Sequence, residues 1–140
     1  MSLIPKLADI PDLSPVAAGE YDLRIIKAQE TKSKRTGRYG TLFIIDILGE
    51  DNADNIMHTV WFGNYKDFQD DDDDKNIKMW RMVKEFIKSL GLDPEEDLEA
   101  EDFVDVEFTA LVTYNDGMSI DEDGNPVKLG APRNELGKIL

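Results

Sequence analysis

The sequence contains no cysteine and only one histidine among its 140 residues. Without cysteine the chain can form no disulfide, no thiolate nucleophile and no cysteine-ligated zinc site, so its stability must come from packing. No run approaches the roughly 20 apolar residues that a membrane-spanning helix needs, and the N-terminal stretch lacks the continuous apolar segment of a signal peptide. We therefore expect a soluble, cytoplasmic protein that does not contact a membrane.

Positive charge is also scarce: 16 Lys and Arg face 30 Asp and Glu, which gives a formal net charge of −14. Taken alone, this charge disfavours a polyanionic partner, because long-range attraction to nucleic acid needs positive potential. The imbalance is uneven, however. Residues 1–48 carry seven bases and six acids, whereas residues 49–140 carry nine bases and 24 acids. The excess acid therefore belongs to the second part of the chain.

The length and the 41% hydrophobic content fit one domain with a single core. Residues 1–18 contain three prolines and no sustained periodicity, which predicts an extended N-terminal arm. We expect the domain proper to span residues 19–140.

Three strands are predicted in the first half of this domain. From Glu20 to Gln29, alternation places Tyr21, Leu23, Ile25 and Lys27 on one side of a strand. A polar, basic segment then leads into residues 39–48, rich in β-formers, so a hairpin is expected. After a turn at residues 49–55, residues 56–64 supply the third strand.

The spacing of apolar residues changes after five consecutive aspartates, Asp70 to Asp74. We expect these aspartates in a solvated loop. From Lys75 onward, apolar residues recur at spacings of three and four, typical of an amphipathic helix. Trp80 and Phe86 fall on its apolar stripe and are expected in the core. Gly91 stands where a glycine C-cap is expected, so the helix should end just before it.

Alternation returns from Phe103 to Tyr114, and residues 133–140 can form a last short strand. Turn chemistry occupies residues 115–117 and 121–125 between them. Three strands, a helix and two strands is the element order of an OB-fold. The predicted fold is thus mainly β, a five-stranded OB-fold-like barrel with one α-helix between strands 3 and 4.

A resemblance to a known family also supports an OB-fold. The run VAAGEYDLRIIKAQETKSKRTGRYGTLFIIDILGE, the helix ending in SLGL and the terminal GAPRNELGKIL together resemble phage-encoded single-stranded DNA-binding proteins of OB-fold type. The resemblance covers most of residues 16–140. It implies non-sequence-specific binding of single-stranded DNA in phage or prophage replication or recombination, within the bacterial host cell and without catalysis or a cofactor.

The chain departs from that family at its end. Many such proteins finish in an acidic tail that recruits partners, whereas here the terminus is Gly137-Lys138-Ile139-Leu140. Acid is concentrated instead in residues 70–74 and 93–107. We expect this acidic surface to be the contact for any replication or recombination proteins, and a homodimer is left open.

Proteins bind single strands through basic grooves and through aromatic faces on which bases stack. The only concentrated basic cluster lies in and around the first hairpin, which in an OB-fold flanks the binding face. The residues predicted to contact DNA are Lys27, Lys32, Lys34, Arg35, Arg38, Tyr39, Phe43, Trp61, Tyr65 and Arg133.

Each of these residues has a plainer interpretation. The basic residues at the hairpin tip would equally be explained as charges that keep a loop solvated. Any of the strand aromatics would equally fit the core. Arg133 would equally form a surface salt bridge with the abundant acid. His58 is expected to be an ordinary strand histidine, since no triad or zinc spacing surrounds it.

Three other interpretations are weighed against DNA binding. The segment starting at Asp121 resembles a calcium loop, but its twelfth position is Pro132 rather than the bidentate Glu, so we reject a metal site. No nucleophile–base pair or phosphate loop suggests an enzyme. The alternative to DNA binding is an acidic protein-interaction domain or DNA-mimic inhibitor, with residues 70–74 and 93–107 as its surface.

Overall fold

The computed structural model describes residues 11–62 and 74–140. Its elements, in chain order, are β1 (Gly19–Lys32), β2 (Tyr39–Ile47), β3 (Ile56–Trp61), α1 (Asp74–Ser89), a 3-10 turn η3 (Ala100–Phe103), β4 (Glu107–Asn115), β5 (Met118–Ile120), β6 (Pro126–Lys128) and β7 (Arg133–Ile139). No helix in these ranges is long and apolar enough to cross a membrane.

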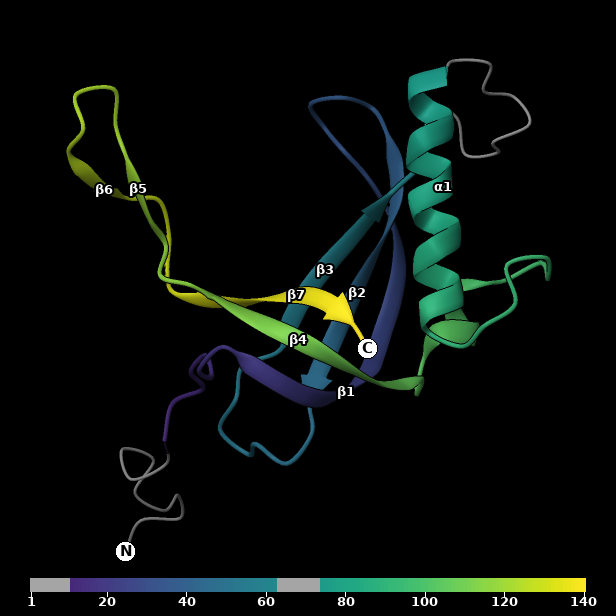
Figure 1. The fold of residues 1–140 in the computed structure, drawn as a ribbon, viewed down its shortest axis with the longest axis horizontal. Helices are drawn as coiled ribbons and strands as arrows, with labels where there is room; N and C mark the ends of the chain where they lie inside the picture. The colour runs from purple at the N-terminus through teal and green to yellow at the C-terminus, as the bar shows by residue number, and fades with distance from the viewer. Residues whose placement is uncertain (1–10, 63–73) are drawn as a thin grey trace, which may run out of the picture.

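The main sheet has five strands in the order β3-β2-β1-β4-β7, and every pairing in it is antiparallel (Figure 1). The predicted mainly β fold with one helix after the third strand is confirmed. The edge strands β3 and β7 approach each other and line one groove, but no ladder joins them. The sheet is therefore open rather than closed into a barrel.

One face of this sheet carries the core. Leu23 and Ile25 of β1 pair with Ile47 and Ile45 of β2, and all four side chains are buried. The remaining buried members of the cluster are Phe43, Ile56, Leu90, Phe103, Ala110 and Val112. α1 covers this face with Phe86, whose ring lies 5.3 Å from that of Phe43. The predicted packing of Phe86 on the core is thus correct, whereas Trp80, predicted with it, is not among the residues packed on this cluster.

A β-bulge interrupts β1 at Ile26, between Ile25 and Lys27. The extra residue shifts the alternation by one position. Lys27 therefore pairs with Ile44 on the face opposite the core, whereas Ile25 pairs with Ile45 on the core face. The predicted placement of Lys27 on the same face as Ile25 is wrong for this reason.

The helix prediction holds closely. α1 begins at Asp74 and ends at Ser89, and Gly91 follows with φ 81°. The Gly91 N–H donates to the Lys88 carbonyl (2.9 Å) and the Leu92 N–H to the Ile87 carbonyl (3.2 Å), the two bonds of a Schellman cap. Most of the aspartate run, residues 70–73, lies outside the described residues.

The fourth strand starts later than predicted. Phe103 belongs to η3 and is buried in the core, and β4 begins at Glu107. Between them Asp105 adopts φ 70° and its N–H donates to the Ile25 carbonyl (2.7 Å). A residue in the left-handed conformation cannot continue a strand. The alternation of apolar and polar residues from Phe103 to Val106 therefore belongs to a turn that packs on β1.

The segment after β4 contains a feature that the sequence reading missed. Both predicted turns are present, but β5 and β6 pair across residues 121–125 to form a separate two-stranded hairpin. This hairpin projects from the body of the molecule (Figure 1). The last predicted strand is present as β7.

The predicted N-terminal arm is described only from residue 11 onward. Ser14 pairs with Ala53 in an isolated parallel bridge, and the Asp54 N–H donates to the Ser14 carbonyl (3.0 Å). Ser14 thus lies against the β2–β3 turn.

Candidate nucleic-acid interface

The face of β1, β2 and β3 that points away from the core forms one continuous surface, which we call the outer face. The strand register brings its side chains into rows, because paired residues on antiparallel strands lie on the same side. These rows are Thr31–Gly40–Trp61, Gln29–Leu42–Thr59 and Lys27–Ile44–Met57.

The outer face is apolar at its centre and polar along β1. Met57 is 64% exposed, and Leu42, Ile44 and Trp61 are each partly exposed. Aliphatic and aromatic side chains left in contact with water on a sheet are unusual unless something covers them. Of the residues on this face, the sequence reading selected Lys27 and Trp61 and missed the others, although their alternation with core residues was visible.

The basic hairpin between β1 and β2 stands at the end of the outer face that carries Trp61. Its loop is closed by the Ser33 N–H donating to the Arg38 carbonyl (2.8 Å) and by the Gly37 N–H donating to the Ser33 carbonyl (2.9 Å). Lys34 and Arg35 occupy the exposed tip. Two exposed cations therefore stand beside an apolar strand face, a combination found in proteins that bind single strands.

Lys32 and Tyr39 pair across the base of this hairpin on the other side of the sheet, in register with Phe43. The Lys32 ammonium lies 5.1 Å from the Tyr39 ring centroid, a cation–π contact. These two predicted residues are brought together, but they face the α1 side rather than the outer face.

The side chain of Arg38 contacts α1. Its Nη1 lies 3.4 Å from the Phe62 carbonyl oxygen, to which it donates, and 3.0 Å from Met79 Sδ. Its guanidinium therefore links the end of β3 to α1, a role that sequence proximity to Lys34 and Arg35 did not suggest.

Phe43 was predicted as a stacking residue, and that prediction is wrong. Its side chain is 2% exposed and lies between the rings of Phe86 (5.3 Å) and Phe103 (5.2 Å). A base cannot reach a ring that is enclosed on both sides. The alternation around Phe43 was correctly read, but it could not reveal which face is buried.

Trp61 and Phe62 point to opposite sides at the end of β3. Phe62 stacks on Trp80 of α1 with ring centroids 5.2 Å apart. Trp61 lies over Gly40 on the outer face, where a Cβ on residue 40 would be 2.8 Å from the indole Cε3. Gly40 thus provides the space that the indole occupies. Tyr65, another predicted site residue, lies outside the described residues.

The last two predicted cations have acidic neighbours. Lys27 lines a shallow pocket with Glu99 and Glu101 of the segment around η3, which lowers the positive potential there. Arg133 Nε donates to Glu135 Oε1 at 3.1 Å, which agrees with the salt-bridge interpretation. Among the described residues, no three His, Asp or Glu side chains gather as a metal site.

One family model matches the chain. Residues 6–122 match the family described as Protein of unknown function (DUF669). The chain belongs to the DUF669 family. The matched segment includes the outer face, the basic hairpin, α1 and β5, and it ends before β6 and β7. No curated protein matches this DUF669 chain.

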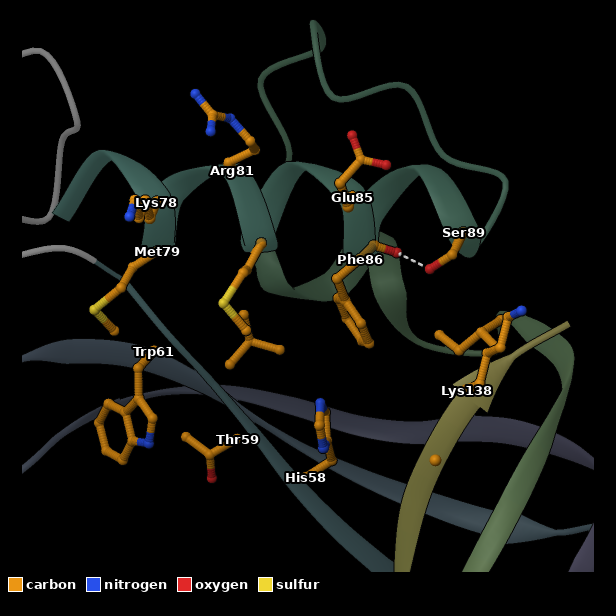
Figure 2. Close-up of a pocket in the computed structure, with 14 residues that line it drawn as sticks. His58, Thr59, Trp61, Lys78, Met79, Arg81, Glu85, Phe86, Ser89 and Lys138 are labelled. Atoms are coloured by element: carbon orange, nitrogen blue, oxygen red, sulfur yellow. Dashed lines mark hydrogen bonds between the residues drawn. The ribbon is translucent and has the colours of Figure 1, made fainter. Parts of the chain in front are cut away.

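A second surface lies at the free edge of β3, and it shares Thr59 and Trp61 with the outer face. A groove of about 910 Å³ runs between β3 and α1 and reaches β7 at one end (Figure 2). We call this the edge groove. His58 points from β3 into it toward Phe86, with ring centroids 5.5 Å apart. Burial lowers the pKa of the His58 imidazole below its ordinary value of 6.5.

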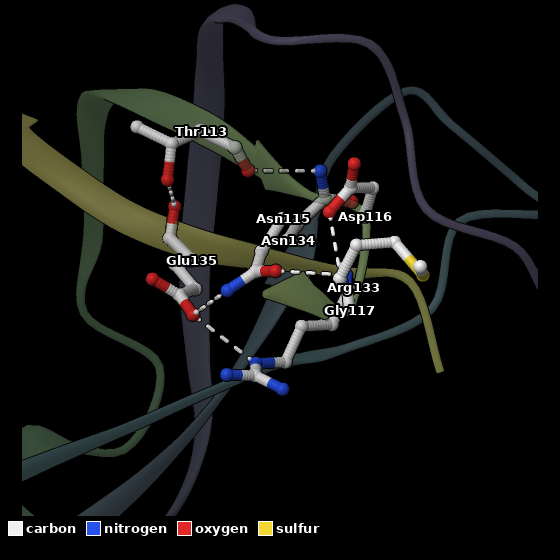
Figure 3. Close-up of polar contacts among 8 residues, drawn as sticks. Thr113, Asn115, Asp116, Gly117, Arg133, Asn134 and Glu135 are labelled. Carbon is white, nitrogen blue, oxygen red and sulfur yellow. Dashed lines mark hydrogen bonds and ion pairs between the residues drawn. The ribbon is translucent and has the colours of Figure 1, made fainter. Parts of the chain in front are cut away.

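The terminal motif around Arg133 makes polar contacts within the fold (Figure 3). Asn134 is 7% exposed, and its amide nitrogen donates to the carbonyls of Val16 (2.8 Å) and Thr113 (3.1 Å). Its Oδ1 accepts the Val16 N–H (2.8 Å). Asn134 therefore fixes the N-terminal segment against β4 and β7, a role that the sequence reading missed.

Proposed function

We propose that this DUF669 chain binds single-stranded DNA without sequence specificity, through the outer face of β1, β2 and β3 and the basic hairpin beside it. The observation that carries the proposal is the register that places exposed Met57, partly exposed Ile44 and Trp61 on one face. Lys34 and Arg35 stand at one end of that face.

The chemistry of the surface suits unpaired bases. Apolar and aromatic side chains give bases a place to stack, and stacking does not discriminate strongly among sequences. Gln29 and Thr31 on β1 add hydrogen-bonding groups along the same face. Duplex DNA hides its bases, and an acidic body repels it, so single strands are favoured.

We further propose that the sheet is an open OB-fold barrel. In the observed order β3-β2-β1-β4-β7, joining β7 to β3 would give the strand neighbours of that fold. The helix between β3 and β4 supports the same interpretation. The loop between the first two strands is then one of those that flank an OB-fold binding face, as the basic hairpin does here.

The cellular role follows from the binding. Coating of single strands during phage or prophage replication or recombination in the bacterial cytoplasm is the proposed setting, with no catalytic step. The exposed acids of residues 93–102 would contact replication or recombination proteins. A DNA-mimic inhibitor is the competing proposal, and that same acidic segment is the observation that favours it.

Titration of fluorescent oligo-dT with the protein at low salt tests the proposal. We expect saturable binding that Lys34→Glu/Arg35→Glu abolishes. The control Lys84→Glu/Lys88→Glu changes the net charge equally on α1, away from the outer face, and should retain most of the affinity. Absence of binding by the unaltered protein would overturn the proposal, as would equal loss in both variants. Affinity for a basic nuclease with none for DNA would instead support the mimic.

A further inference from the structure

The β5–β6 hairpin exposes an unusual amount of apolar surface for so short an element. Ile120 is 71% exposed and Leu129, just after β6, is 75% exposed. Met118 and Val127 are 45% and 37% exposed. Apolar side chains gathered on a projecting ribbon indicate a surface that is covered by a partner.

The tip of this hairpin is acidic. Asp121 holds the turn, since its Oδ1 accepts the N–H groups of Asp123 (3.0 Å) and Asn125 (2.9 Å). The side chains of Glu122 and Asp123 are exposed at the same turn. The hairpin therefore combines an apolar stem with a negative tip.

The edge groove is also apolar, but its charged residues are mainly cations. Met79, Met82 and Phe86 of α1 line it, and Met82 is 71% exposed although it lies on an otherwise apolar stripe. Among the described residues that line it, the cations are Lys78, Arg81 and Lys138, and the one acid, Glu85, is paired with Lys88 at 3.8 Å. In a chain of net charge −14, these described lining residues carry a net positive charge.

In the described part of the chain, the hairpin and the groove also each have an unpaired strand edge. β3 pairs with β2 along one edge, and no described strand pairs with its other edge, which borders the groove. An unpaired strand edge offers backbone N–H and C=O groups to an added strand. β5 and β6 pair only with each other, so each presents a free edge as well.

The hairpin cannot fill the groove of its own molecule. Figure 1 places the β5–β6 hairpin and α1 on opposite sides of the sheet, well separated. A contact between the two surfaces must therefore join two copies.

From this complementarity of charge, apolar surface and strand edges, we propose that the β5–β6 hairpin of one copy docks in the edge groove of the next. In this proposal the contact is head-to-tail rather than reciprocal, so each dimer retains one free hairpin and one free groove. The protein then assembles beyond the dimer, independently of DNA.

Sedimentation velocity without DNA tests the proposal. The unaltered protein should show species larger than a dimer as its concentration rises from micromolar to millimolar. Ile120→Glu/Leu129→Glu removes the apolar stem, and Lys78→Glu/Lys138→Glu reverses the groove; both variants should be monomeric. All four residues are exposed or line the surface, and unchanged circular dichroism and melting temperature verify folding. Glu95→Lys/Glu96→Lys, on neither surface, is the charge-reversal control and should assemble normally.

Mixing the two variants gives the decisive result. The hairpin variant keeps an intact groove and the groove variant keeps an intact hairpin, so together they should form a dimer and nothing larger. Adding Glu122→Lys/Asp123→Lys to the groove variant in the same chain should likewise restore assembly, because it exchanges the charges of tip and groove. The proposal is overturned if the unaltered protein stays monomeric, if assembly stops at a symmetric dimer, or if the mixture remains monomeric.

Discussion

Asn134 joins three segments through one buried amide. Its side chain makes hydrogen bonds to both backbone groups of Val16 and to the Thr113 carbonyl. Replacing it by alanine removes the hydrogen-bond partner of three partly buried backbone groups. We expect Asn134→Ala to lower the free energy of unfolding by about 1–3 kcal/mol in urea denaturation. Asn125→Ala, at an exposed turn, is the matched control and should have little effect.

His58 gives the molecule a pH-dependent stability. Burial lowers the pKa of its imidazole from the ordinary value of 6.5, because the charged form loses hydration. Between the lowered pKa and 6.5 the unfolded chain therefore binds more protons than the folded one. Stability conferred by the neutral ring is complete above this range and is lost as pH falls through it.

Comparison with His58→Gln isolates this contribution. The difference in the free energy of unfolding between the two proteins, measured by urea denaturation, should change as pH falls below 6.5. It should be constant above that value. A difference independent of pH would show that the histidine titrates normally in the folded state.

Trp61 is the aromatic residue best placed to stack a base on the outer face. We expect Trp61→Ala to weaken oligo-dT binding by about 1–3 kcal/mol, the usual contribution of one stacked base, and Trp61→Phe to recover part of it. In a Trp80→Phe background the remaining tryptophan is Trp61, so its quenching by oligo-dT reports the contact directly. Full binding without quenching would remove Trp61 from the interface.

At the scale of elements, α1 is the one whose limits follow from local sequence. Its end depends on Gly91 at φ 81°, a conformation that disfavours a Cβ. We expect Gly91→Ala to lower the free energy of unfolding by about 1 kcal/mol and Gly91→Asn by less, since asparagine tolerates the left-handed region better. Thermal melts of the three proteins check this order, and an alanine variant as stable as the original would contradict it.

The strands were less predictable than the helix. Alternation correctly placed Tyr39 and Phe43 on one face of β2, but burial of that face depends on Phe86 and Phe103, far along the chain. The bulge at Ile26 reversed the side on which Lys27 lies. A period of two cannot reveal an inserted residue, because the pairing partner that defines the bulge is on another strand.

At the scale of the whole molecule, the salt dependence of the affinity for single-stranded DNA distinguishes phosphate contacts from base stacking. Each phosphate contact on a single strand contributes about 0.7 to the slope of log affinity against log salt. Lys34→Gln/Arg35→Gln should therefore reduce that slope by about 1.4. Trp61→Ala should weaken binding with the slope unchanged, and the opposite pattern would contradict the assignment of hairpin and outer face.

The sequence alone determined the β-rich fold with one helix, the Gly91 cap and the basic hairpin, because these depend on periodicity and turn chemistry within a few residues. Only the tertiary structure decided that Phe43 is core, that Arg38 reaches α1 and that Asn134 holds Val16. It also created the edge groove, since β3 and β7 are far apart in the chain. Such features arise from contacts between distant residues, which no local pattern records.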